Sequence, residues 1–237
     1  ESEFWPNLLR WARLSGARVA VVNARVSDRS LPRYLRFRPL VHRVMRNIDL
    51  FLAQSPEDAD RLVRIGAPAD RVEVSGNLKF EVKPAAKSEL AGRLQSAIAR
   101  AQIGPVIVAG STLEGEEKLL LEMYRRVLAE HSSAMLLLAP RHPQRFDAVA
   151  TLIAQSGLPW ERRSQWDGQR SLRGRVFLLD SIGELSSLYA LADLAFIGGS
   201  LVPRGGHNVL EAAQFGLPIL VGPYTQNFRD IIGIFCA

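Results

Sequence analysis

Residues 106–112 read VIVAGST, and Glu116–Glu130 (EEKLLLEMYRRVLAE) follows almost directly in the 237-residue chain. The run VIVA is apolar throughout, which is typical of a strand in a parallel sheet that helices cover on both faces. The second stretch repeats its apolar residues with helical spacing. A buried strand, a tight turn and an amphipathic helix in this order indicate a doubly wound α/β domain.

The same alternation extends to both sides of this unit. Further apolar runs predict strands at 18–23, 50–54, 72–75, 135–139, 176–179, 194–197 and 219–221, and helical windows cover 88–102, 145–157, 184–192 and 208–215. The charged, proline-containing stretch 81–87 (EVKPAAK) separates the two groups of strands. We therefore predict an α/β fold of two Rossmann-like domains. They comprise residues 1–95, including a linker, and 96–237, and we expect the first to be truncated and the second incomplete at its end.

The composition excludes several classes of protein. With 47% hydrophobic and 23% charged residues, the chain is neither disordered nor collagen-like. A single cysteine, Cys236, excludes a disulfide framework, and the four histidines lack metal-ligand spacing, so we expect no metal site. No apolar run approaches the roughly 20 residues of a membrane span. The net charge of +6 comes mostly from 26 arginines, which favours an anionic partner or reflects a compositional bias.

Polar and glycine-rich loops follow the predicted strands at their carboxyl ends, where parallel α/β sheets bind ligands. After the run 106–109, the turn with Ser111 and Thr112 could bind an anion or simply cap the next helix, and both interpretations stay open. After the run 135–139, two prolines stiffen the loop that carries Arg141 and His142. We expect these two side chains to point towards a ligand.

The densest cluster follows the strand predicted at 194–197. Two Gly-Gly pairs within nine residues would let the backbone approach a ligand closely. The carboxylate of Glu211, in the first turn of the next helix, could bind a ribose diol, and the amides at the helix start could bind phosphate. The cluster contributes these candidates: Gly199, Ser200, Gly206, His207, Asn208 and Glu211.

The first half carries cations rather than glycine-rich loops. Lys79 follows the strand predicted at 72–75, where it could bind phosphate or simply be solvated. Residues 25–46 hold seven arginines against one acid, Asp28, with apolar residues between them. This pattern suits an anionic membrane or lipid head group, although a solvated helix face explains it as well. Nucleic acid is a third interpretation, but no nucleic-acid-binding motif supports it, and we expect no such partner.

Ten motifs together resemble those of bacterial 3-deoxy-D-manno-octulosonic acid (Kdo) transferase, the lipid A glycosyltransferase family. They run in the family order along nearly the whole chain. The matching stretches are 1–7 (ESEFWPN), 23–30 (NARVSDRS), 76–80 (GNLKF), 110–117 (GSTLEGEE), 140–146 (PRHPQRF), 162–164 (RRS), 180–185 (DSIGEL), 192–201 (ADLAFIGGSL), 205–211 (GGHNVLE) and 222–228 (GPYTQNF).

The resemblance implies an inverting, metal-independent GT-B glycosyltransferase without a cofactor. It would transfer Kdo from CMP-Kdo to the lipid A precursor, lipid IVA, at the cytoplasmic face of the bacterial inner membrane. The matching positions imply that Glu1 and Lys79 stabilise the transition state, and we expect the general base and any membrane anchor to precede Glu1. The positions that match the family's CMP-binding motifs are Pro140, Arg141, Ile182, Gly183, Glu184, Asn208, Val209, Leu210 and Glu211.

The chain departs from the family pattern at four loop positions. Leu113 and Tyr224 stand where the family usually has histidine, Ile182 replaces a methionine and Val209 a proline. These substitutions could alter nucleotide contacts but leave Arg141 and Glu211 in place. Two alternatives stay open: a non-catalytic fragment that binds a sugar nucleotide or an anionic lipid, and a two-domain sugar-nucleotide epimerase.

Overall fold

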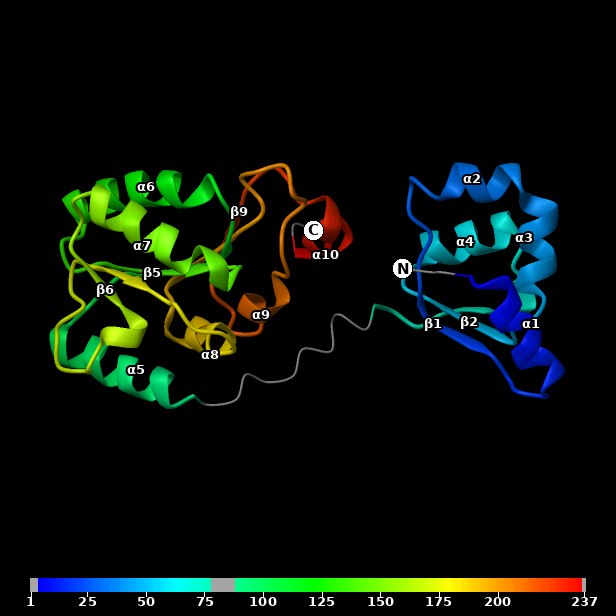
Figure 1. Cartoon of the computed structure of the whole chain (residues 1–237), viewed down its shortest axis with the longest axis horizontal. Helices are drawn as coiled ribbons and strands as arrows, with labels where there is room; N and C mark the ends of the chain where they lie inside the picture. The colour runs from blue at the N-terminus through cyan, green and yellow to red at the C-terminus, as the bar shows by residue number, and fades with distance from the viewer. Residues whose placement is uncertain (1–3, 78–87, 236–237) are drawn as a thin grey trace. The chain divides into compact units, whose positions relative to one another are not determined.

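The computed structural model describes residues 4–77 and 88–235 and divides into two compact units, Glu1–Glu81 and Val82–Ala237 (Figure 1). Within the described residues, no helix combines the length and the apolar character that crossing a bilayer requires.

The first unit is a small parallel α/β layer. Its strands β1 (Ala20–Ala24), β2 (Leu50–Ala53) and β3 (Val72–Val74) form a sheet in the order β1-β2-β3. The helices are α1 (Pro6–Leu14), α2 (Leu31–Arg36), α3 (Arg38–Met45) and α4 (Pro56–Ile65), and a short 3-10 turn, η1 (Ala69–Arg71), precedes β3. Phe51, Met45 and Leu62 are fully buried between the sheet and the helices. Their burial provides the hydrophobic stabilisation of this unit.

Helix α4 shows how the local sequence sets the limits of an element. The Ser55 hydroxyl accepts a hydrogen bond from the Asp58 amide (3.1 Å), and Pro56 occupies the first helical turn. At the other end Gly66 adopts φ 119°, a left-handed conformation that favours glycine, and a β-carbon there would lie 2.8 Å from the His42 side chain. The helix therefore begins and ends where its capping residues place it.

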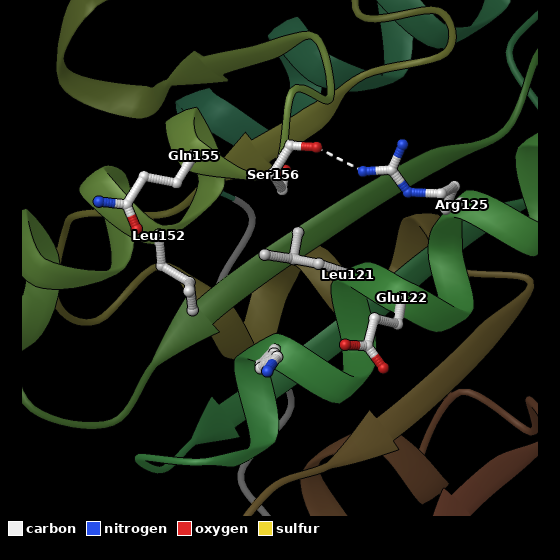
Figure 2. A pocket seen from close by; sticks show the side chains of 7 residues that line it. Leu121, Glu122, Arg125, Leu152, Gln155 and Ser156 are labelled. Atoms are coloured by element: carbon white, nitrogen blue, oxygen red, sulfur yellow. Dashed lines mark hydrogen bonds between the residues drawn. The ribbon is translucent and has the colours of Figure 1, made fainter.

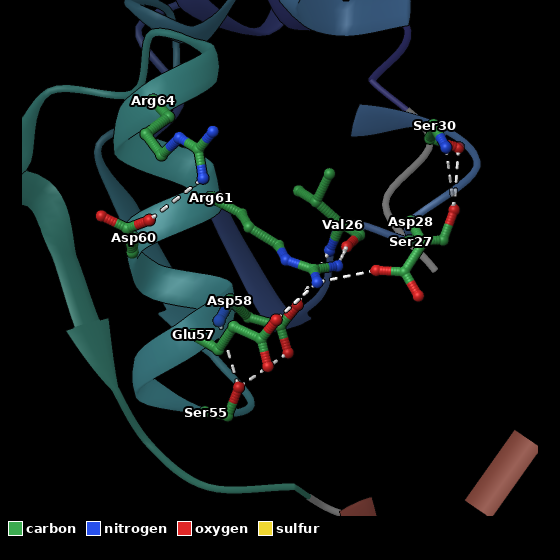
Figure 3. A network of polar contacts seen from close by, with 10 residues as sticks. All are labelled: Val26, Ser27, Asp28, Ser30, Ser55, Glu57, Asp58, Asp60, Arg61 and Arg64. Carbon is green, nitrogen blue, oxygen red and sulfur yellow. Dashed lines mark hydrogen bonds and ion pairs between the residues drawn. The ribbon is translucent and has the colours of Figure 1, made fainter. Parts of the chain in front are cut away.

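A polar network ties the β1–α2 loop to α4 (Figure 3). The buried Asp58 carboxylate accepts a hydrogen bond from the Val26 amide (3.1 Å), and Arg61 donates to the Val26 carbonyl (2.8 Å). Arg61 also pairs with Asp28 (2.7 Å). Asp28, the only acid of the arginine-rich segment, is thus paired with an arginine from outside that segment.

The second unit is a doubly wound domain with a six-stranded parallel sheet in the order β6-β7-β5-β4-β8-β9. The strands are β4 (Val106–Thr112), β5 (Met135–Pro140), β6 (Trp160–Arg162), β7 (Val176–Leu178), β8 (Leu194–Ile197) and β9 (Ile219–Val221). The helices are α5 (Glu89–Ala101), α6 (Glu116–Glu130), α7 (Phe146–Gln155), α8 (Leu185–Leu188), α9 (Leu210–Ala213) and α10 (Arg229–Phe235). Short 3-10 turns complete the unit at η3 (Pro143–Arg145), η4 (Arg163–Gln165), η5 (Tyr189–Leu191) and η6 (Gln226–Phe228).

Helices cover both faces of this sheet, as the continuous apolar strands predict. Helices α6 and α7 pack on one face, and α5 and α8 lie on the other (Figure 1). The strand order reverses between β4 and β8, because the chain passes from β4 to β5 on one side and returns to β8 on the other. A doubly wound sheet binds ligands at such a reversal, beyond the carboxyl ends of the strands.

The predicted α/β fold with two Rossmann-like units is confirmed, and each predicted strand is present. The division of the chain falls before residue 95, however. Leu90 and Leu94 of α5 are buried in the core of the second unit, so residues 89–95 pack there rather than with the first. Strand β6 and helices α1, α2, α3, α4 and α10 were not among the predicted elements.

Candidate functional site

The buried carboxylate of Glu116 organises the loops at the strand reversal. One of its oxygens accepts hydrogen bonds from the amides of Leu113 and Gly199, both at 2.8 Å. The other accepts hydrogen bonds from the amides of Ser200 (3.0 Å) and Leu201 (2.9 Å). Glu116 is 0% exposed, so it joins the loop after β4 to the loop after β8 inside the protein.

This arrangement corrects the predicted role of Gly199 and Ser200. Their amides bind Glu116 and are therefore not available to a phosphate. The Ser200 hydroxyl is fully buried as well: it donates to the Ile197 carbonyl (2.5 Å) and accepts from the Gly222 amide (2.9 Å). We assign Ser200 a structural role, because all of these groups are used within the protein.

The glycines after β8 permit close packing of the protein on itself. A β-carbon on Gly198 would lie 2.2 Å from the Ser111 carbonyl oxygen, and one on Gly199 would lie 2.9 Å from the His207 ring. Gly206 adopts φ 79° and donates its amide to the Gly199 carbonyl (2.8 Å). Small residues are thus required here to bring β4, β8 and His207 together.

Thr112 also has a partner inside the protein. Its buried hydroxyl donates to Glu117 (2.9 Å), and Arg145 binds the same carboxylate with two nitrogens, at 2.7 and 3.1 Å. Glu117 raises the pKa of Arg145 by direct hydrogen bonding. Neither Ser111 nor Thr112 caps α6, whose N-cap is Gly115. Ser111 has φ 56° and is partly exposed at the end of β4, so its hydroxyl stays a candidate contact.

Arg141, His207 and Glu211 lie within electrostatic range of one another. Burial raises the pKa of Glu211, and the positive charge of Arg141 opposes that rise. Burial and the same arginine hold the pKa of His207 below its ordinary value, which keeps the imidazole neutral at neutral pH. Arg141 is exposed, while its amide donates to the Thr112 carbonyl (3.0 Å) and fixes the loop.

These three side chains have unused hydrogen-bonding capacity. Among the described residues, the Arg141 guanidinium and the Glu211 carboxylate have no hydrogen-bonding partner. The Nε2 atom of His207 is buried and also lacks one. His142 lies close enough to His207 to contribute to the lowering of its pKa. A cationic group and a carboxylate that are both unpaired can bind a ligand with both an anionic group and hydroxyls.

Four further residues were predicted to contact CMP next to Arg141 and Glu211: Pro140, Asn208, Val209 and Leu210. Pro140, Val209 and Leu210 are buried. The Asn208 carboxamide oxygen accepts a hydrogen bond from the Leu210 amide (3.1 Å) at the start of α9. Asn208 thus orients the first turn of the helix that carries Glu211.

The loop after β7 carries the other predicted contacts. Gly183 adopts φ 86° and Ile182 is 71% exposed. The Glu184 carboxylate binds Arg163 with both oxygens (3.1 and 3.2 Å) and accepts a hydrogen bond from Ser181. Burial alone would raise the pKa of Glu184, but these hydrogen bonds outweigh burial and lower it. Glu184 is therefore ionised and held by the protein, while Gly183 and Ile182 remain accessible.

Asp180 holds the RRS motif beside this loop. It accepts hydrogen bonds from Arg162 (2.5 Å) and from both the amide (2.9 Å) and the hydroxyl (2.6 Å) of Ser164. Burial would raise the pKa of Asp180, but these donors outweigh it and lower the pKa. The ends of β6 and β7 are thus fixed to each other.

Two of the hollows of the second unit differ in size and position. A polar cleft of about 720 Å³ lies at the carboxyl ends of the strands, and loops after β4, β5 and β8 line it. Its lining residues are Leu113, Glu114, His142, Arg145, Val202, Pro203 and Arg204. A smaller hollow of about 280 Å³ lies between α6 and α7, where Arg125 donates to the Ser156 carbonyl (Figure 2). Only the first adjoins the strand reversal, so we take it as part of the candidate site.

The predicted catalytic residues Glu1 and Lys79 lie outside the described residues, and their roles stay predictions. Within residues 4–77 and 88–235, no group of three or more His, Cys, Asp and Glu side chains could hold a metal ion. Sequence reasoning missed the organising roles of Glu116, Glu117 and Asp180. For Glu116 and Glu117, the sequence signal was their position directly after the turn that ends at Gly115.

Comparison with known proteins identifies the family. A family model described as 3-deoxy-D-manno-octulosonic-acid transferase (kdotransferase) matches residues 1–82. The chain is 40% identical over 233 residues to the 3-deoxy-D-manno-octulosonic acid transferase of Bordetella pertussis, covering 97% of this chain and 53% of the relative. It is 36% identical over 232 residues to that of Haemophilus influenzae, covering 98% and 54%. The chain thus spans about half the length of these curated relatives.

A solved structure also resembles this chain. It is the C-terminal CMP-Kdo binding domain of WaaA from Acinetobacter baumannii, with 35% identity and a TM-score of 0.55. The match covers 61% of this chain and 78% of that domain. Together with the two parallel α/β units, it supports the predicted GT-B class. The chain therefore belongs to the 3-deoxy-D-manno-octulosonic acid transferase family.

Proposed function

We propose that this chain is part of an inverting, metal-independent glycosyltransferase that moves Kdo from CMP-Kdo to the lipid A precursor in lipopolysaccharide biosynthesis. One observation carries the proposal. The unpaired Arg141 and Glu211 side chains, beyond β5 and at the start of α9, lie within electrostatic range of each other, and the chain resembles a CMP-Kdo binding domain.

Each side chain has a chemical role in this proposal. Arg141 binds the CMP phosphate and stabilises the negative charge that it gains when the bond to the sugar breaks. Glu211 accepts hydrogen bonds from the ribose hydroxyls, and its partial burial strengthens them because water competes less. Neutral His207 adds no charge beside this site. The exposed Ile182 and Gly183, in the loop after β7, offer further contacts to the nucleotide.

We further propose that the first unit serves the anionic acceptor or its membrane, at the cytoplasmic face of the inner membrane. Arg33 and Arg36 are exposed, and their guanidinium groups lie 5.8 and 5.9 Å from the ring centres of Tyr34 and Phe37. Leu40, on the following helix, is 63% exposed. Exposed arginines interleaved with exposed apolar side chains favour an anionic lipid surface over plain solvent.

Calorimetric titration of CMP tests the donor site. Glu211→Ala removes the proposed ribose acceptor and should weaken CMP binding by about 1.5–3 kcal/mol, the range for hydrogen bonds to charged groups. Glu122→Ala, which removes an exposed carboxylate from α6, should leave the affinity unchanged. Equal CMP affinities for parent and Glu211→Ala would refute the assignment.

A further inference from the structure

The polar cleft beside Arg141 contains two arginines, and only one of them is available to a ligand. Arg145 donates from both terminal guanidinium nitrogens to Glu117, which is 1% exposed, so its charge is already balanced inside the protein. Arg204 is exposed, and its guanidinium has no hydrogen-bond or ion-pair partner among the described residues. Arg204 is therefore the arginine of this cleft that can bind an anion.

Hydrogen bonds fix the backbone on both sides of Arg204. Its amide donates to the Val202 carbonyl (2.7 Å), and its carbonyl accepts from the Asn227 carboxamide (3.1 Å). The next residue, Gly205, accepts a hydrogen bond from the Asn227 amide (2.9 Å). Less conformational freedom is then lost when the side chain binds a ligand.

The cleft and the proposed nucleotide site adjoin each other. His142 lines the cleft and directly follows Arg141 in the chain, and both residues act electrostatically on His207. A β-carbon on Gly115 would lie 3.5 Å from Val202, so the loops after β4 and β8 meet at the cleft wall. A ligand whose phosphate lies at Arg141 can therefore extend a second group into the cleft.

We propose that Arg204 binds the carboxylate of the donor sugar and so selects an acidic sugar over a neutral one. The proposal rests on the proposed function, in which the sugar is an octulosonic acid. A guanidinium matches a carboxylate with two parallel hydrogen bonds. Leu113, Val202 and Pro203 line the same cleft and provide apolar surface that reduces competition by water.

Two anionic groups could lie at Arg204, the sugar carboxylate or the nucleotide phosphate, and binding measurements separate them. The affinities of freshly prepared CMP-Kdo and of CMP would be measured for the parent chain, Arg204→Gln, Arg204→Lys and the control Arg126→Gln. Arg126 is an exposed arginine of α6, away from the cleft. Circular dichroism would verify that all variants fold.

We expect Arg204→Gln to bind CMP-Kdo at least about 10-fold more weakly than the parent and to bind CMP within about twofold of it. Arg204→Lys should retain part of the preference, since it keeps the charge but not the planar fork. An equal loss for both ligands would assign Arg204 to the phosphate and overturn the proposal, as would no loss for either. A parent chain that binds neither ligand would instead contradict the proposed function, and the inference would fall with it.

Discussion

Glu116→Ala should lower the free energy of unfolding of the second unit by about 3–5 kcal/mol. The substitution leaves four amides without their acceptor, the buried ones of Gly199 and Ser200 and the partly buried ones of Leu113 and Leu201. A buried donor left unsatisfied costs roughly 1–3 kcal/mol, and local relaxation would recover part of the sum. Glu116→Gln should cost nearly as much, because its amino group would face two backbone N–H donors.

Urea unfolding, combined with hydrogen exchange of the amides in β4 and β8, measures this effect for the second unit alone. Glu114→Ala is the matched control, because Glu114 is exposed and lies two residues away. It should change the stability by no more than about 0.5 kcal/mol. If Glu116→Ala were as stable as Glu114→Ala, the organising role of this carboxylate would be disproved.

Replacing Arg33, Arg36 and Arg43 together with glutamine should weaken binding to anionic vesicles by about 3 kcal/mol at low salt. Each arginine near an anionic surface contributes about 1 kcal/mol, and salt screens that contribution. All three are exposed. Arg38 is left unchanged because its Nε donates to the Arg64 carbonyl (2.9 Å), which gives it a structural contact.

Co-sedimentation with vesicles of equal parts phosphatidylglycerol and phosphatidylcholine measures this binding at low and at physiological salt. A Lys118→Gln, Arg126→Gln double variant of α6 removes two exposed cations from the second unit and serves as the control. The triple variant should lose binding, whereas the control should resemble the parent. Parent-like binding by the triple variant at both salt concentrations would show that these arginines only solvate α2 and α3.

The strands were predictable from the sequence because apolar runs buried on both faces leave a continuous signal. Strand β6 lacked that signal: it has three residues, and the middle one, Glu161, is a buried acid whose partner Arg170 (2.8 Å) lies outside the strand. Helix α4 was predictable in principle, since Ser55-Pro56 and Gly66 are start and stop signals. Apolar periodicity alone did not predict this helix, whereas its caps mark both of its ends.

The sequence predicted the position of the site, because the topology of a parallel sheet decides which loops meet at its carboxyl edge. Polar residues after β5 and at the start of α9 had to meet at the carboxyl edge of a parallel sheet, and Arg141 and Glu211 lie within electrostatic range there. Ser200 and Thr112 satisfy the same rule but turn inwards. The sequence does not reveal whether a polar group binds a ligand or a buried partner, because the partner, here Glu116 or Glu117, depends on side-chain packing.

The central claim is that CMP binds to the second unit around Arg141 and Glu211. The most direct test is to locate the CMP-binding site on this chain. Titration of CMP into the ¹⁵N-labelled chain, followed by amide chemical shifts, locates the contacts without any mutation. We expect the largest shift changes at Arg141 and at residues 207–211, with little change at residues 4–77. Changes confined to the first unit, or to the hollow between α6 and α7, would contradict the proposed donor site.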